Sequence, residues 1–344
     1  MRCRGLQVVA YVRVGGGRLA GGWCWKPIAR HLRDHGHDAY PLTLTGLGER
    51  AHLASPEVDL ETHIIDVANL IEFENLRDVV LLGHSYAGIV VTGAADRIPE
   101  RIAQLVYLDS GPVPDGLAFL ETQPPEIRQH TQPVVTKHGD GWRLPMPSWD
   151  ELENVYGASL EGLDEERREL MRSRAVAQPF GTYTQPLRLA NAVVRGVLPK
   201  LLITNSFPLA QVKELIASEH PWFRELAGPE WRFVELPTGH WPMFSRPDDL
   251  AALLIEIPPM GSTRYRVGCH PTSENRTTRQ SDDASSTVAH PPKLCAAYGA
   301  RYPTVMSQSP GKVGKIVPGR WARGIATRAP TLFTEVPSPP STMI

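Results

Sequence analysis

Ser85 is the residue whose type and setting best suit catalytic chemistry. It lies in segment 83–88, GHSYAG, after the apolar run 79–82 and before residues 89–95, which continue as a helix. A serine hydroxyl is a weak nucleophile, so it must project from a sharp strand-to-helix turn where a base can reach it. The small residues two before and two after Ser85, Gly83 and Ala87, allow such a turn. We predict that Ser85 is a nucleophile; the alternative is a turn whose serine only caps a helix.

His240 is the candidate general base. It lies in a loop that follows the predicted strand at 231–236, about 155 residues after Ser85. A neutral imidazole can accept the serine proton and return it to a leaving alcohol, because its ordinary pKa of ~6.5 lies near working pH. We expect His84 to shape the turn rather than to serve as the base, and we place His84 and Trp241 among the substrate-binding candidates.

The third candidate is a carboxylate that would orient His240. The chain order nucleophile, acid, histidine requires this acid between Ser85 and His240, at the end of a strand. The predicted strand 198–204 is followed by Asn205-Ser206-Phe207 without an acid, whereas Asp109 ends the predicted strand 102–108. Asp109 is therefore the preferred acid. Glu214 and Glu219 remain alternatives.

Backbone amides must stabilise the oxyanion that forms when Ser85 attacks a carbonyl. The Tyr86 amide, at the start of the predicted helix, is one candidate donor. Gly17 and the Arg18 amide are the others, because they lie in a glycine-rich loop after the first predicted strand and glycines allow close approach of the backbone. The alternative for this segment is a flexible phosphate-binding type of loop or a simple surface loop.

Strands and helices alternate around these candidates, which indicates an α/β fold with a mostly parallel sheet and helices on both faces. The rhythm stops between about 115 and 197, where polar, proline-rich stretches surround a charged helical segment at 163–174. We predict a hydrolase core at 1–114 and 198–257, with a cap inserted at 115–197. Further predicted strands lie at 6–14 and 38–42, and predicted helices at 25–35, 60–72, 209–218 and 247–257.

Charge is distributed unevenly, although the whole chain has a formal net charge of -1. Residues 258–344 contain eleven Lys or Arg against four acids, a net +7, so the preceding residues carry -8. Rich in Pro, Ser, Thr and Arg and without periodicity, this tail is expected to be disordered. Scattered charge without an aromatic platform does not favour nucleic-acid binding.

Cysteine spacing and hydropathy limit the other classes of protein. The four cysteines lie far apart without a CxxC pair, so neither a zinc site nor a disulfide framework is predicted. No stretch approaches the ~20 apolar residues needed to cross a bilayer, and the first residues lack the features of a signal peptide. We expect a cytoplasmic protein that binds neither membrane nor metal, and the oligomeric state stays open.

The stretch from about residue 21 to residue 257 resembles the EstC-like alpha/beta-hydrolase esterases, relatives of the plant methylesterase and hydroxynitrile lyase group. The resemblance is carried by GGWCW at 21–25, TLTGLGER at 43–50, GHSY at 83–86, VYLD at 106–109 and LPTGHWPMF at 236–244. It implies a small cap over a mostly apolar pocket, no cofactor, and action on carboxylic esters with short acyl groups or aromatic parts. It also implies that Ser85 is the nucleophile and His240 the base.

This chain departs from that family after its first predicted strand, where it has Gly16-Gly17-Arg18-Leu19 in place of His-Gly, a small residue and Trp. The predicted function is a serine carboxylesterase acting on a small-molecule ester through an acyl-enzyme. Lactone hydrolysis would use the same residues, and a catalytically silent binder of small ligands is the alternative from another class. Hydroxynitrile cleavage is disfavoured because the Asn205-Ser206 loop offers no cation.

Overall fold

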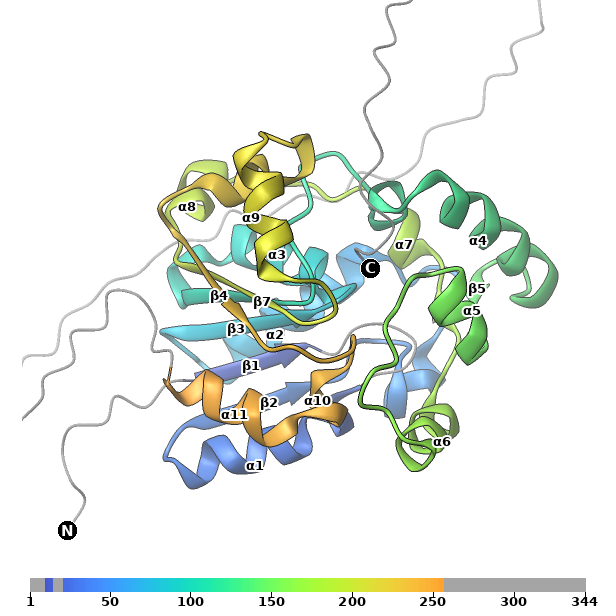
Figure 1. Ribbon diagram of the computed structural model, residues 1–344, viewed down its shortest axis with the longest axis horizontal. Coiled ribbons are helices and arrows are strands. Elements are labelled where there is room, and N and C mark those ends of the chain that lie inside the picture. The colour runs from blue at the N-terminus through green and yellow to red at the C-terminus, as the bar shows by residue number, and fades with distance from the viewer. Residues whose placement is uncertain (1–9, 15–20, 257–344) are drawn as a thin grey trace, which may run out of the picture. The chain divides into compact units, whose positions relative to one another are not determined.

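A parallel sheet of six strands forms the centre of the computed structural model, which describes residues 10–14 and 21–256 (Figure 1). The strand order is β2-β1-β3-β4-β7-β8, and each neighbouring pair runs parallel. The strands are β1 (Ala10–Val14), β2 (Asp38–Leu42), β3 (Val79–His84), β4 (Ile102–Leu108), β7 (Lys200–Thr204) and β8 (Trp231–Glu235). This architecture confirms the predicted α/β-hydrolase fold class.

Helices cover both faces of the sheet (Figure 1). Apolar side chains of α2, α3 and α9 pack on one face, and those of α1 and α11 on the other. The helices are α1 (Lys26–Asp34), α2 (Leu60–Phe73), α3 (Ala87–Arg97), α4 (Pro125–His138), α5 (Trp149–Asn154), α6 (Glu165–Arg174), α7 (Gly181–Thr184), α8 (Ala192–Val197), α9 (Leu209–Ala217), α10 (Pro242–Ser245) and α11 (Pro247–Glu256).

The central strand β3 is an almost continuous apolar run because both of its faces are buried. In β3, Leu81 belongs to the core beneath α2 and α3, whereas Leu82 belongs to the core beneath α1 and α11. All six residues of β3 are buried. The carboxyl ends of parallel strands meet at one edge of a sheet, and this edge is where such folds place their sites.

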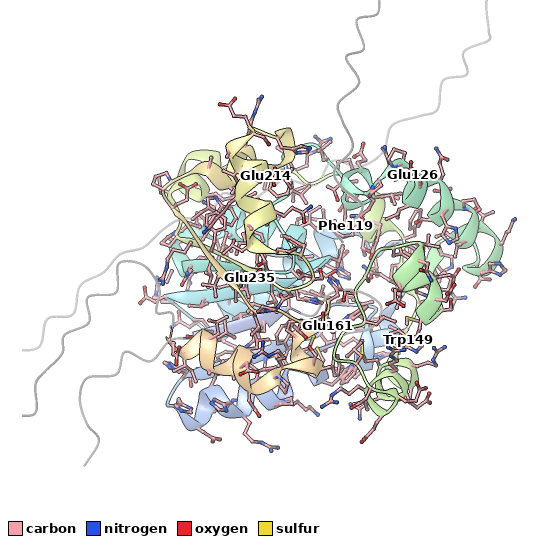
Figure 2. All side chains as sticks on the ribbon, viewed as in Figure 1. Phe119, Glu126, Trp149, Glu161, Glu214 and Glu235 are labelled. Carbon is pink, nitrogen blue, oxygen red and sulfur yellow. The ribbon has the colours of Figure 1, made fainter. Side chains whose placement is uncertain are left out.

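Residues 115–197, here called the inserted segment, connect β4 to β7. They contain α4 to α8 and a two-stranded antiparallel pair, β5 (Arg143–Leu144) with β6 (Gln178–Pro179). The predicted helix at 163–174 is present as α6, whereas α4 and α5 were not predicted. The loop at Glu161 runs beside α10 and the sheet (Figure 2). The division into a core and a cap stays a prediction.

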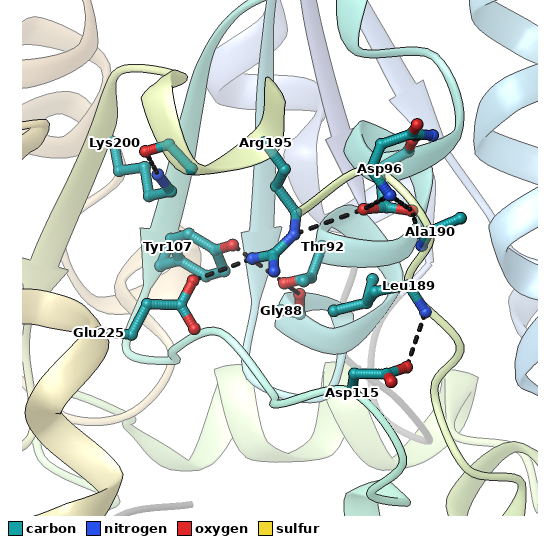
Figure 3. Close-up of polar contacts among 12 residues, drawn as sticks. Gly88, Thr92, Asp96, Tyr107, Asp115, Leu189, Ala190, Arg195, Lys200 and Glu225 are labelled. Atoms are coloured by element: carbon teal, nitrogen blue, oxygen red, sulfur yellow. Dashed lines mark hydrogen bonds and ion pairs between the residues drawn. The ribbon is translucent and has the colours of Figure 1, made fainter. Parts of the chain in front are cut away.

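The end of the inserted segment is fixed to the core through Asp96, a buried residue of α3 (Figure 3). Its carboxylate accepts hydrogen bonds from the amides of Ala190 and Asn191 at 2.7 and 3.0 Å. Arg195 lies between two acids, 3.6 Å from Asp96 and 2.9 Å from Glu225. A buried carboxylate requires such partners, so this cluster sets where the chain returns from the inserted segment to β7.

Several predictions fall on residues that the structure does not describe. Gly17 and Arg18, the start of the first predicted strand and the tail at 258–344 all lie outside the described residues. Within residues 10–14 and 21–256, no helix has both the length and the apolar character to cross a bilayer. The same ranges contain no cluster of three or more His, Cys, Asp or Glu side chains suited to a metal ion. The cytoplasmic location stays a prediction.

Leu81→Ala tests the buried face of β3. Leu81 is fully buried, so removing its side chain should lower the free energy of unfolding by about 2–5 kcal/mol through lost burial and a residual cavity. Urea denaturation followed by tryptophan fluorescence measures the change. Leu53→Ala is the matched control, because Leu53 is 43% exposed and its truncation should cost little. Equal losses in the two variants would contradict the assignment of β3 to the core.

Candidate active site

Ser85 occupies a strained turn between β3 and α3. Its φ of +53° lies in the left-handed region, which is costly for a residue other than glycine. The turn is close-packed: a Cβ added at Gly83 would lie 2.6 Å from the Ala87 carbonyl oxygen, and one at Gly88 only 2.1 Å from Ser110 Oγ. Gly83 and Gly88 are therefore the positions that require glycine, whereas the methyl group of Ala87 is accommodated in the core.

Asp109 also has a left-handed backbone, with φ of +45°, at the end of β4. Its carboxylate is buried and receives four hydrogen bonds. The amides of Asn205 and Ser206 each donate to Oδ1 at 3.1 Å, while Ser206 Oγ at 2.6 Å and His240 Nδ1 at 2.7 Å contact Oδ2. Burial alone would raise the pKa of Asp109, but the hydrogen bonds from His240 and Ser206 outweigh it and hold this pKa below its ordinary value.

His240 is oriented by this carboxylate. An ionised carboxylate only accepts hydrogen bonds, so the 2.7 Å contact requires a proton on Nδ1 of His240. In the neutral imidazole, Nε2 then carries the free lone pair. The backbone of this loop is held by the inserted segment, because the amides of His240 and Gly239 donate to the carbonyls of Ser159 and Glu161 at 2.9 and 3.2 Å.

The two alternative acids lie elsewhere. Glu214 lies on α9 with an exposed side chain (Figure 2), and Glu219 is exposed just beyond the same helix. Neither is hydrogen-bonded to His240 in the described part of the chain, whereas Asp109 contacts it directly. The geometry therefore favours Asp109 as the acid, and its catalytic role stays a prediction.

Tyr86 is the N-cap residue of α3, where the first backbone amides have no intrahelical partner. Its ring is fully buried and stacks on Tyr183 at 5.3 Å. The hydroxyl contacts Nδ1 of His63 at 2.9 Å, and Nε2 of His63 lies 2.8 Å from the Thr45 carbonyl oxygen. Because a carbonyl only accepts, Nε2 carries the proton and the Tyr86 hydroxyl donates to Nδ1. Tyr86, the residue after Ser85, is thus held by its backbone at the start of α3 and by its hydroxyl at His63.

The two substrate-binding candidates both contact His240. His84 Nε2 donates to the His240 carbonyl oxygen at 2.6 Å, and the ring of Trp241 meets that of His240 edge-on at 4.9 Å. His84 is fully buried, and burial lowers its pKa to about 3. Neither belongs to the described lining of the pocket beside Ser85. Their placement suits support of the base, and substrate binding by either stays a prediction.

A mostly apolar pocket opens beside Ser85, with a volume of about 110 Å³. That is of the same order as the ~150 Å³ apolar cavity that holds one benzene molecule. Its lining comes from the loop after β4, the 3-10 helix Phe119–Thr122 with the residue that follows it, the strand β7 and the loop between β7 and α9, and the 3-10 helix Pro221–Ala227. The described lining residues are Ser85, Asp109, Ser110, Gly111, Pro112, Val113, Phe119, Thr122, Gln123, Leu202, Phe207, Phe223 and Leu226.

The sequence did not indicate the residues that contact the candidate site residues and hold them in place. The Asn205-Ser206 loop was considered only as a place without an acid, yet its amides and hydroxyl surround Asp109. His63 is fully buried and contacts the Tyr86 hydroxyl, a contact that the sequence alone did not indicate. One feature of the sequence could have indicated Ser206. It lies in a polar loop at the end of an apolar strand, and Asp109 ends the neighbouring strand.

Comparisons with known proteins agree with this architecture. The model of the Alpha/beta hydrolase family matches residues 15–253. A carbendazim hydrolyzing esterase from a Nocardioides species is 38% identical over 255 residues, covering 70% of this chain and 96% of that relative. A pyrethroid hydrolase from Sphingobium wenxiniae is 26% identical, with coverages of 70% and 85%. An extracellular alpha/beta-hydrolase from a Paenibacillus species has a TM-score of 0.59 at 22% identity, covering 73% of this chain and 98% of its own.

The low pKa of His84 predicts acid lability. In the unfolded chain this imidazole binds a proton below pH 6.5, whereas in the folded protein it does so only near pH 3. The unfolded state therefore binds more protons in this window, so the free energy of unfolding falls as pH decreases from 6.5 towards 3. In His84→Gln this contribution disappears, and urea midpoints between pH 7 and 4.5 should show a shallower slope. His52→Gln, at an exposed position, should keep the wild-type slope.

Proposed function

The chain belongs to the alpha/beta hydrolase family and is an ester hydrolase, and on this premise we propose that it is a serine carboxylesterase that acts through an acyl-enzyme. Ser85 is the nucleophile, His240 the general base and Asp109 the acid that orients it. The observation that carries the proposal is the 2.7 Å contact between His240 Nδ1 and Asp109, because it leaves Nε2 as the basic nitrogen. Ser85 and Asp109 also line one pocket.

Acylation begins when the Ser85 hydroxyl transfers its proton to Nε2 of His240 and its oxygen attacks the ester carbonyl carbon. The C=O electrons move to the oxygen, which the Tyr86 amide at the start of α3 stabilises; the amides of Gly17 and Arg18, which lie outside the described residues, are the further donors that the sequence proposes. The imidazolium, stabilised by the ionised Asp109, then gives its proton to the alkoxide as the C–O bond breaks.

Deacylation repeats these steps with water. His240 takes a proton from the water molecule, the hydroxide attacks the acyl carbonyl, and the Ser85 oxygen leaves with the proton from His240. The products are a carboxylic acid and an alcohol. A lactone would follow the same course, with the alcohol and acid in one molecule. These steps use the chain's own side chains and amides together with one water molecule.

The pocket supports small esters as substrates. Its volume of about 110 Å³ and apolar lining suit a short acyl chain or one aromatic ring. The relatives named for carbendazim and pyrethroid hydrolysis support the same class, since the activities in their names concern small organic molecules. We propose that the inserted segment acts as a cap over this pocket, because it contributes Phe119, Thr122 and Gln123 to the lining.

Replacing the three proposed catalytic residues tests the mechanism. Ser85→Ala and His240→Ala should lower kcat for p-nitrophenyl acetate and butyrate by about 10⁴-fold or more, and Asp109→Asn by about 10⁴-fold. Release of p-nitrophenol is measured against purified wild type. Ser218→Ala and His52→Ala alter exposed residues and should retain activity. A folded wild type without turnover would instead favour the silent ligand binder.

Ser206→Ala tests the support of the acid. Losing the 2.6 Å hydrogen bond to Asp109 should lower kcat about tenfold with little change in KM. Because this bond lowers the pKa of Asp109, its removal makes the carboxylate more basic, and a more basic carboxylate stabilises the imidazolium of His240 more strongly, so the acidic limb of the activity profile should move to a higher pH. Profiles of kcat/KM from pH 4 to 8 measure the shift, and Ser206→Thr should restore both properties. An unchanged profile in Ser206→Ala would show that the hydroxyl is only structural.

A further inference from the structure

Two polar side chains of the pocket have no place in the mechanism: Thr122 and Gln123, which immediately precede α4. Gln123 is 6% exposed, although glutamine is usually a surface residue. The other polar lining residues are already engaged, because Ser85 and Asp109 are catalytic candidates and Ser110 Oγ donates to the Ser85 carbonyl at 2.6 Å. The amide of Gln123 therefore stands in a mostly apolar pocket without an assigned role.

Hydrogen bonding determines how this amide is turned. The Thr122 hydroxyl donates its single proton to the Phe119 carbonyl oxygen at 2.7 Å, since a carbonyl can only accept. Thr122 Oγ1 is then only an acceptor for its other neighbour, the side chain of Gln123 at 3.1 Å. Only the Nε2 end of the amide can donate to it. The chain of bonds thus presents Nε2 to Thr122 and turns Oε1 away from it.

Within the described residues, Oε1 of Gln123 has no hydrogen-bond partner, and Gln123 lines the pocket. An amide oxygen that lacks a protein donor and faces a mostly apolar pocket can accept a hydrogen bond from a ligand, which then takes the place of water at this atom. The rings of Phe119, Phe207 and Phe223 also line the pocket and suit a flat ring.

Building on the proposed function, we propose that Gln123 is a specificity-determining residue whose Oε1 accepts a hydrogen bond from an O–H or N–H group of the substrate. The preferred substrates are esters that place in this pocket an aromatic ring bearing a hydroxyl or amino substituent. The recognition needs no charge on the ligand. A site built to bond a substrate hydroxyl discriminates against the analogue that lacks it, because the protein acceptor is then left without a partner.

Binding of ketones that cannot be hydrolysed tests the proposal independently of turnover. Calorimetry on the full chain compares 3- and 4-hydroxyacetophenone with 3- and 4-methylacetophenone, which replace the donor by a methyl group. The measured quantity is the Kd of each methyl compound divided by the Kd of the matching hydroxy compound. For at least one pair, this ratio should be about tenfold larger in wild type than in Gln123→Met. Thr122→Val, which keeps Gln123 but removes the group that orients it, should also reduce this ratio.

Kinetics provide the second comparison. The ratio of kcat/KM for p-nitrophenyl 3- or 4-hydroxybenzoate to that for the matching methylbenzoate should fall about tenfold in Gln123→Met. Taking a ratio of ratios cancels the intrinsic reactivity of each ester. Gln132→Met changes an exposed glutamine of α4 and should leave both ratios unchanged.

The outcomes separate the two proposals. If hydrolysis does not depend on Ser85 but the ketone preference requires Gln123, the mechanism is wrong and the specificity stands. In the converse outcome, hydrolysis depends on Ser85 while the hydroxy-to-methyl ratios of binding and of kcat/KM are equal in wild type and Gln123→Met. If circular dichroism shows that both proteins are folded, this result overturns the proposed specificity. An unfolded Gln123→Met leaves the decision to Thr122→Val, where an unchanged ratio would also overturn it.

Discussion

A buried carboxylate is the constraint around which this part of the molecule is organised. Asp109 lies out of reach of bulk water, and a charge in that position is tolerated only where hydrogen bonds replace hydration. Its partners come from the loops after β7 and β8, and these two strands lie next to β4 in the sheet, in the order β4-β7-β8. Satisfying one charge therefore fixes three loops at a common edge and determines which ring nitrogen of His240 carries the proton.

Ser85 belongs to the same edge but is held by different physics. Its turn depends on close approach of backbone and on the absence of side chains at Gly83 and Gly88, rather than on charge. The buried contact between Tyr86 and His63 then holds the N-cap residue of α3 in place. The turn at Ser85 therefore depends on steric fit, whereas the contact between Asp109 and His240 depends on charge and hydrogen bonding, although Ser85 and Asp109 line one pocket.

Much of this could be predicted from the sequence because parallel strands are recognisable as apolar runs. The strand at Ile102–Leu108 has its predicted bounds, and the turn at Ser85 follows from its small residues. The inserted segment was harder, since Pro125 and Pro133 obscured α4, although proline at the start of a helix is favourable. The contacts of Ser206 with Asp109 span about a hundred positions and depend on strand order, which local patterns do not contain.

The hydrogen bonds from Gly239 and His240 to the carbonyls at 159 and 161 give the inserted segment a second duty. If the inserted segment moved as one rigid piece, it would carry the loop of His240 with it, because these two backbone hydrogen bonds join them. Residues 159–161 are thus coupled to the loop after β8, although they lie far from both ends of the inserted segment. Replacing this segment by another would have to preserve both hydrogen bonds.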